Sequence, residues 1–291
     1  MKKQKTVRKE VKGRLSEFIL VKKFRETIEQ MLTNKLYIIQ PGIFDILLVF
    51  IYGFITQPIW VKVLEQIQAI AYVAQNQPRA ISQNIPTEGI VGAFAGDVTV
   101  YYLRNFLILL LILAIITYFV YCFFQGIAWY FAKRQGRKET IFYKYLRQFF
   151  RINVLWFILF LIYYTINVVY GYIAQRAIRF NQATNVSLVF WTLMIFLILI
   201  AYFAFISYGL IGNYRDRIIY NKSFVMGVTK VHIILPMFLI IIGIFITINY
   251  ILKFAALANN WFAIILGFIL TIPALAFTRL YLVKVIEGVD K

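Results

Sequence analysis

The sequence predicts an all-α, polytopic integral membrane protein with six transmembrane helices and both termini on the cytoplasmic side. Three observations lead to this prediction: an apolar composition, six long apolar stretches, and a one-sided distribution of Lys and Arg. Of the 291 residues, 62% are hydrophobic and only 15% are charged, whereas about a quarter of the residues in a soluble domain are charged. Such a chain requires an apolar solvent.

Six apolar stretches meet or approach the length of about twenty residues that a helix needs to cross the hydrocarbon core of a bilayer. They lie at Ile43–Val61, Asn105–Phe124, Ile152–Ala174, Leu188–Ile211, Val231–Leu252 and Trp261–Thr278. The predicted transmembrane domain therefore covers residues 43–285, between an arm at 1–42 and a short tail at 286–291. Six crossings place the arm and the tail on the same side of the membrane.

The basic residues are divided unequally between the two sides that these crossings define. The arm, the loop at 126–151, the connection between the fourth and fifth crossings, and the chain after the sixth contain 25 of the 31 Lys and Arg. Cytoplasmic loops of membrane proteins carry such an excess. We therefore expect these segments to be cytoplasmic in a cell membrane, or to face the equivalent compartment in an organelle inner membrane.

The formal net charge of +19 would also be typical of a nucleic-acid-binding protein. Here, however, the basic residues flank apolar stretches, which is their expected place in a membrane protein. We therefore predict anionic lipid headgroups on the cytoplasmic side as partners, and no nucleic acid. The single cysteine and the single histidine exclude an intramolecular disulfide and a His-rich metal site.

The arm is basic and amphipathic. Its apolar residues with the spacing of one helical face are Leu15, Phe18, Ile19, Ile28, Met31 and Leu32. We predict that it lies on the cytoplasmic membrane surface and that Lys22, Lys23 and Arg25 contact lipid headgroups. A turn at residues 40–42, with the sequence QPG, is expected to separate the arm from the first crossing, because Pro and Gly interrupt helices at such joints.

Two of the loops are expected to be ordered. The outer loop at 62–104 begins with apolar residues at helical spacing. In the basic loop at 126–151, Lys144, Arg147 and Arg151 share one helical face, opposite several aromatic residues. This segment is predicted to be a helix in the headgroup plane, with the three basic side chains on anionic lipid; the alternative is a cytoplasmic extension of the third crossing.

Few polar residues interrupt the crossings. Asp45 is the only acidic residue inside one, and we expect it to be paired with a nearby Lys35, Arg217 or Arg279, of which Arg279 is the candidate for a buried ion pair. The residues that would form a polar seam between the third and fifth crossings are Thr165, Asn167, Thr247 and Asn249. Polar side chains of this kind join helices inside membranes.

The order of apolar helix, basic loop, Ser/Thr-started amphipathic turn and apolar helix occurs twice, around "KRQGRKETIFYKYLRQFFR" and around "NYRDRIIYNKSFVMGVTK". In this layout the chain from about Asn105 to Lys284 resembles the membrane domains attached to some glycerophosphodiester phosphodiesterases and related polytopic proteins. The resemblance implies a membrane scaffold. It assigns no catalytic residues, because the soluble phosphodiesterase domain is absent from this sequence.

The sequence contains no evident catalytic site and calls for no cofactor. It is most compatible with a structural or accessory subunit of a membrane assembly, which binds lipids and either other membrane proteins or further copies of itself. One alternative is a transporter or channel for a small solute or lipid, with Asn167, Asn249, Thr165 and Tyr164 around a cavity. Another is a lipid-modifying membrane enzyme that uses Asp45 or His232.

Overall fold

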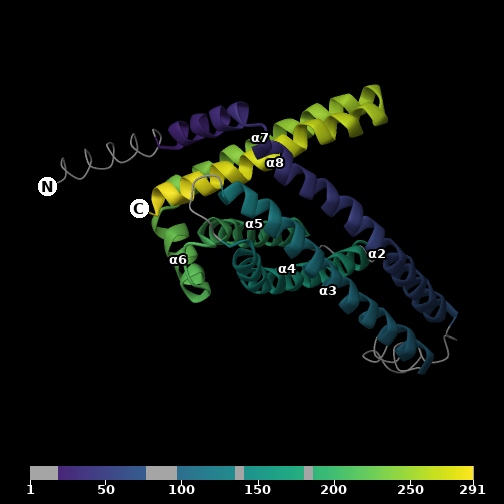
Figure 1. Ribbon diagram of the computed structural model, residues 1–291. Helices are drawn as coiled ribbons and strands as arrows, with labels where there is room; N and C mark the ends of the chain where they lie inside the picture. Colours follow the sequence, from purple (N-terminus) through teal and green to yellow (C-terminus); the bar gives the residue numbers. More distant parts are fainter. Residues whose placement is uncertain (1–18, 77–96, 135–140, 180–185, 291) are drawn as a thin grey trace. The chain divides into compact units, whose positions relative to one another are not determined.

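The computed structural model describes residues 19–76, 97–134, 141–179 and 186–290. Within these ranges every regular element is a helix (Figure 1). A helix over residues 19–33 precedes α2 (Leu36–Asn76), α3 (Asp97–Arg134), α4 (Phe142–Arg179), α5 (Val186–Leu210), α6 (Asp216–Thr229), α7 (Val231–Ala258) and α8 (Asn260–Val289).

Six of these helices, α2, α3, α4, α5, α7 and α8, are long and apolar enough to cross a membrane. The prediction of a helical membrane protein with six crossings is therefore confirmed, and the chain is a multi-pass integral membrane protein. The helices are longer than the predicted crossings. With 41 residues, α2 measures about 60 Å at a rise of about 1.5 Å per residue.

The predicted turn at residues 40–42 is wrong, because α2 continues through Pro41 and Gly42. The chain breaks earlier, at Asn34, whose side-chain oxygen accepts a hydrogen bond from the Leu36 N–H at 3.1 Å. Pro41 lies in the second turn of α2 and removes one backbone donor there, yet the helix continues through it. Gly42 lies against α8: a Cβ atom at this position would approach Ile272 Cγ2 to 2.4 Å. It permits close packing of the two helices.

The chain divides into two compact units. The smaller one, Ile46–Tyr121, contains most of α2 and of α3. Within it, the hydroxyl groups of Tyr52 and Thr117 form a hydrogen bond at 3.1 Å. Of the predicted outer loop at 62–104, both described ends are helical: α2 extends to Asn76 and α3 begins at Asp97. The rest of this loop lies outside the described residues.

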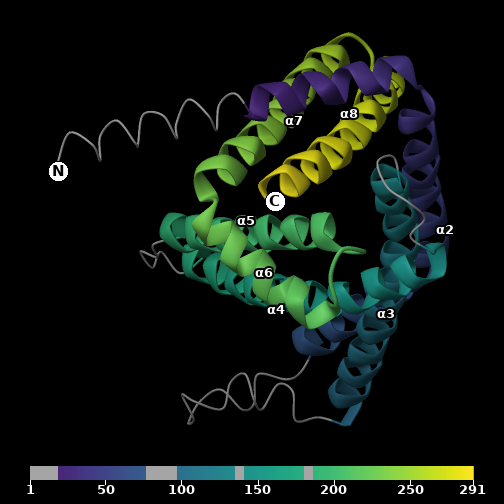
Figure 2. The same cartoon turned by 60° about the vertical axis from the view of Figure 1, so that its left-hand side comes forward.

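The larger unit, Met1–Asp45 with Cys122–Lys291, contains two groups of packed helices (Figure 2). In the first, α5 packs against α4 and α6; in the second, α7 and α8 form a hairpin, and α5 also contacts α8. The side chain of Asn259 in the hairpin turn caps α8 by accepting a hydrogen bond from the Trp261 N–H at 2.8 Å. Aromatic side chains such as Trp129, Phe149 and Tyr208 fill the interior between α3, α4 and α5.

The segment at 142–151 forms the first turns of α4. This is the alternative arrangement considered above, an extension of the third crossing, and not a separate helix in the headgroup plane. The burial of Phe149 explains why this segment extends α4. Its side chain is fully buried and its ring lies 5.1 Å from that of Tyr208 on α5, so the aromatic face of this segment packs inside the protein and not in the acyl chains.

The described part of the arm packs on α8. The ring of Phe24 lies 5.1 Å from that of Phe277 and 5.7 Å from that of Tyr281, and Lys284 Nζ donates a hydrogen bond to the Glu26 carbonyl oxygen at 2.8 Å. The face buried in this contact contains Leu20, Thr27 and Met31. Of the face predicted from the sequence, Met31 is therefore buried, Ile28 and Leu32 are exposed, and Leu15 and Phe18 lie outside the described residues.

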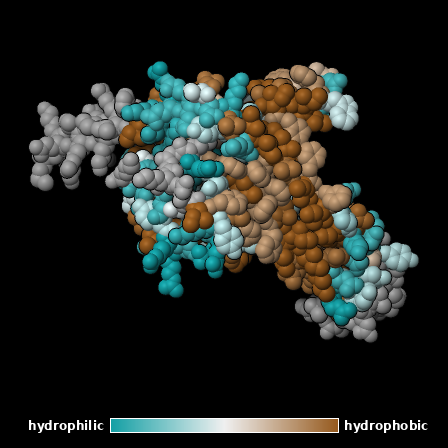
Figure 3. Space-filling model, viewed as in Figure 1, coloured by the Kyte–Doolittle hydropathy of each residue, from teal (hydrophilic) through white to brown (hydrophobic). Residues whose placement is uncertain are grey.

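The visible surface consists of separate hydrophobic and hydrophilic areas (Figure 3). Hydrophobic residues cover the long helices, whereas hydrophilic residues gather around the helix at 19–33, around α6 and, in a separate area at the lower right, at the far end of α2. The C-terminal helix α8 extends to Val289, so most of the stretch predicted as a tail at 286–291 is helical.

Candidate functional site

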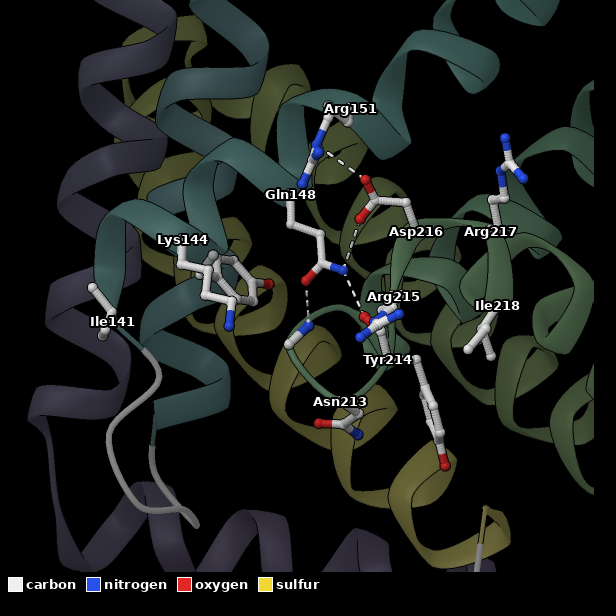
Figure 4. Close-up of a pocket in the computed structure, with 12 residues that line it drawn as sticks. Ile141, Lys144, Gln148, Arg151, Asn213, Tyr214, Arg215, Asp216, Arg217 and Ile218 are labelled. Carbon is white, nitrogen blue, oxygen red and sulfur yellow. Dashed lines mark hydrogen bonds and ion pairs between the residues drawn. The ribbon is translucent and has the colours of Figure 1, made fainter.

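A pocket of about 850 Å³ opens between the start of α4 and the turn that joins α5 to α6 (Figure 4). All of its lining residues belong to the larger unit. Four of them are basic and one is acidic: Lys144, Arg151, Arg215, Arg217 and Asp216. Its walls come from the first turns of α4 and of α6, because Ile141 and Arg215 directly precede those helices.

Gln148 joins the two walls of the pocket. Its amide nitrogen donates to the Tyr214 carbonyl at 2.6 Å and to Asp216 Oδ1 at 3.0 Å, and its amide oxygen accepts from the Gly212 N–H at 2.9 Å. Gly212 has a φ of 82°, a conformation that side chains disfavour and glycine adopts readily. The turn is thus shaped by Gly212 and held to α4 by one buried amide.

Among the described residues of the lining, Asp216 is the only acidic one, and its carboxylate is already paired. Besides Gln148, the Nε atom of Arg151 lies 3.0 Å from Asp216 Oδ2. A carboxylate at the start of α6 also interacts favourably with the helix dipole. Lys144, Arg215 and Arg217 have no ion-pair partner among the residues that the structure describes. The pocket therefore carries an excess of positive charge.

Tyr145 contributes a buried polar atom without a partner to the described part of the lining. The side chain of Tyr145 is 1% exposed, and its buried hydroxyl makes no hydrogen bond within the described part of the chain. An unpaired buried hydroxyl is unfavourable. The described lining therefore contains unpaired cations, one unpaired buried hydroxyl and no unpaired carboxylate.

A second polar cluster is buried, and its members form hydrogen bonds with one another. Arg279 forms a bidentate ion pair with Asp45, with NH1 2.7 Å from Oδ2 and NH2 2.6 Å from Oδ1. Gln125 completes it by accepting from Arg279 NH2 at 2.9 Å and donating to Asp45 Oδ1 at 3.1 Å. The two charged side chains are 5% and 8% exposed. The structure thus brings together the candidate pair Asp45 and Arg279, and adds Gln125, which the sequence did not single out.

Two further contacts involve residues that the sequence pattern marked only as basic. Lys133, 6% exposed, donates to the carbonyl oxygens of Gly209 at 2.8 Å and of Ile211, at the end of α5, where a cation also stabilises the helix dipole. Lys222 on α6 lies 2.5 Å from Asp290 Oδ1. Their acceptors are carbonyl oxygens at the end of α5 and the side-chain carboxylate of Asp290, which no spacing in the sequence reveals.

The pKa values of two side chains on α6, Lys222 and Tyr220, are raised by their surroundings. Burial opposes the charged form of Lys222, but its hydrogen bonds with Asp290 and Tyr214 outweigh this effect, so its pKa is raised above 10.5. Burial and the charge of Asp216 raise the pKa of Tyr220, whose hydroxyl donates to the Ile152 carbonyl at 3.1 Å. At neutral pH, Lys222 is therefore charged and Tyr220 is neutral.

The predicted polar seam is not formed. Its four residues, Thr165, Asn167, Thr247 and Asn249, are all exposed on the surfaces of α4 and α7. The threonine hydroxyls donate to carbonyl oxygens of their own helices, Thr165 to Leu161 and Thr247 to Gly243, each at 2.9 Å. The two helices pack elsewhere, α4 with α5 and α6 and α7 with α8, so the four side chains do not meet.

The six residues predicted to contact headgroups lie outside the interior of the protein. Lys22, Arg25, Lys144, Arg147 and Arg151 are exposed, and Lys23 is half-buried. The pocket brings two of them, Lys144 and Arg151, together with Arg215 and Arg217, and leaves Arg147 outside. His232 is exposed in the first turn of α7.

Comparison with protein-family models, with curated proteins and with solved structures finds no match for this chain. The resemblance to the membrane domain of glycerophosphodiester phosphodiesterases therefore stays a prediction. What the protein does has to be argued from its own geometry.

Proposed function

We propose that the protein is a non-enzymatic structural or accessory subunit of a membrane assembly and that it contacts partner helices through α4 and α7. The observation that carries this proposal is the exposure of Asn167 and Asn249 on the surfaces of these two helices. Both residues lie in helix segments that are apolar enough to cross a membrane.

An exposed asparagine and an exposed threonine differ in how their side-chain hydrogen bonds can be satisfied in a membrane. A threonine hydroxyl is satisfied by its own helix, as in Thr165 and Thr247. The asparagine amide has two donors and an acceptor oxygen, and neither Asn167 nor Asn249 has a hydrogen-bond partner within the described ranges. In hydrocarbon such groups are costly unless a neighbouring helix pairs with them. A partner helix with a polar side chain at the same depth would supply that bond.

The same positions argue against a carrier built around these residues. A solute pathway would require Asn167, Asn249 and Tyr164 to face a common cavity, yet all three side chains are exposed, Tyr164 to 49%. The exposed apolar side chains beside them, among them Val168 and Ile246, supply the close packing that joins membrane helices.

The proposal is tested by the size of the complex after extraction from the native membrane in a gentle detergent. The wild-type chain should migrate in a defined complex larger than the monomer. The double variant N167L/N249L should lose this complex, because it removes both amides while keeping the helices apolar. The matched control T165V/T247V removes polar groups that are satisfied internally and should leave the complex intact.

Two results would contradict the proposal. The first is a monodisperse monomer of the wild-type chain under these conditions. The second is equal retention of the complex by both double variants. Solute flux in proteoliposomes made from the purified chain would support the carrier instead.

A further inference from the structure

We propose that the pocket between α4 and α6 is a binding site for a phosphate group. This inference does not depend on a role in an assembly, because it concerns another part of the molecule. The shared chemistry is a phosphate monoester or diester, carried either by the headgroup of an anionic phospholipid or by a small soluble molecule.

The charge of the pocket favours an anion. Arg151 and Gln148 occupy the carboxylate of Asp216, so the negative charge in the lining is already compensated. Lys144 on one wall and Arg215 on the other have no ion-pair partner among the residues described. In Figure 4 these two side chains extend from opposite walls of the pocket. Guanidinium and ammonium groups are the usual protein ligands of phosphate.

The backbone adds to this field. The first turns of both α4 and α6 line the pocket. Backbone N–H groups in the first turn of a helix have no partner inside the helix and carry a partial positive charge, and for this reason phosphates bind at helix N-termini. Two such termini contribute to a single pocket here, in addition to the basic side chains.

Tyr145 points to a ligand independently of charge. Its side chain is 1% exposed and lines the pocket, and its hydroxyl makes no hydrogen bond within the described chain. Buried hydroxyl groups are normally paired. A phosphate oxygen is an acceptor that would complete this bond, and none of the described residues supplies one.

The size and rim of the pocket fit a headgroup-sized ligand. A volume of about 850 Å³ lies within the range of small-molecule sites, about 300 to 1,000 Å³. The rim contains Ile141 and Ile218, which are 70% and 47% exposed. Apolar residues beside a basic pocket at the end of a membrane helix suit a phosphate that is attached to acyl chains.

The test measures binding to the purified full-length chain in a neutral detergent. Three probes are compared: a short-chain phosphatidic acid, glycerol 3-phosphate and inorganic phosphate. Whichever of these probes binds the wild-type chain should bind the pocket variant K144Q/R215Q about tenfold more weakly or worse, since the variant removes two charge-assisted contacts. The matched control K35Q/K230Q removes the same charge from two exposed positions outside the pocket and should change affinity less than about twofold.

Each outcome is informative. Binding of phosphatidic acid alone, lost in the pocket variant, assigns the site to a lipid headgroup; binding of all three probes, lost in the same variant, assigns it to a free phosphate. Equal weakening in both double variants, or no binding of any probe to the wild-type chain, overturns the proposal. If K144Q/R215Q unfolds at a lower temperature than wild type, Y145F provides a second variant, for which a loss of about threefold is expected because one neutral hydrogen bond is removed.

Discussion

At the scale of single residues, the buried cluster of Asp45, Gln125 and Arg279 determines how three helices meet within the larger unit. Two charges taken out of water are unfavourable unless their geometry is good and their remaining hydrogen-bonding groups are satisfied. Here both carboxylate oxygens accept bonds from Arg279, and Gln125 serves both partners. The cluster is closed, so its role is to hold α2, α3 and α8 in register.

We expect D45N to destabilise the chain by about 3–5 kcal/mol, because it leaves the Arg279 guanidinium buried without a counter-charge. Denaturant unfolding in detergent micelles, followed by circular dichroism, measures this loss. The control E29Q breaks the exposed pair of Glu29 with Arg25 and should cost at most about 1 kcal/mol. The double replacement D45L/R279M should restore part of the stability. A loss for D45N no greater than for E29Q would contradict this role.

The sequence supported part of this residue-level picture. Asp45 stood out because it is the one acidic residue in a predicted crossing, and its partner was limited to three basic residues. Gln125 and Gln148 could not be singled out, since an amide carries no charge and their partners are distant in the chain: Arg279 for the first and the turn at 212–216 for the second. Contacts to backbone atoms of a turn leave no trace in residue spacing.

At the scale of helices, the length of the apolar stretches was sufficient to predict the six crossings. The residues that usually mark turns, Pro and Gly, did not predict correctly where the first of these helices begins. Pro41 and Gly42 are compatible with a turn, but packing of α2 against Ile272 and a cap at Asn34 place the break earlier. The arm was predicted to have one apolar face, of which Met31 is buried and Ile28 and Leu32 are exposed. Its actual partner, the aromatic face of α8 around Phe277, was unknown from sequence, so the buried face could not be chosen correctly.

The helix at residues 19–33, which packs on α8, is expected to lose stability at acidic pH. The hydrogen bond from Lys23, with the nearby charges of Lys284 and Lys22, lowers the pKa of Glu26 below 4.5, against the opposing effect of partial burial. A group with a lowered pKa in the folded state stabilises it fully above the unfolded pKa, and this contribution is lost as the pH falls through the folded value. The arm should therefore loosen below about pH 4.5.

Hydrogen exchange of residues 19–33 between pH 7 and pH 3 measures this effect, with each rate expressed relative to the E26Q variant at the same pH. The protection of wild type over E26Q should disappear at low pH. E29Q, which alters an exposed side chain, should keep the wild-type pH dependence. Equal protection of wild type and E26Q throughout the range would show that Glu26 does not hold the arm.

At the scale of the whole molecule, the polar contacts of the larger unit gather at helix ends that carry basic residues. The pocket at the start of α4, the Lys133 contacts at the end of α5 and the pair of Lys222 with Asp290 all involve segments predicted to be cytoplasmic. The α7–α8 turn differs: around the Asn259 cap, Leu257 and Trp261 are 84% and 76% exposed. The predicted orientation places the first three at the cytoplasmic surface and the α7–α8 turn at the opposite one.

The orientation can be tested with single cysteines in a C122A background. The background removes the one native cysteine, so that each variant contains a single thiol. Cys122 is fully buried and carries no charge, so its replacement by alanine should leave the topology unchanged. Cysteines that replace Lys144 and Arg217 should react with a membrane-impermeant reagent only after the cytoplasmic side is opened, whereas a cysteine at Asn259 should react in intact cells. The physical reason is that 25 of the 31 Lys and Arg are predicted on one side, where membrane insertion retains them. Labelling of positions 144 and 217 from opposite sides would exclude the predicted threading, and with it a pocket built from α4 and α6 at one membrane surface.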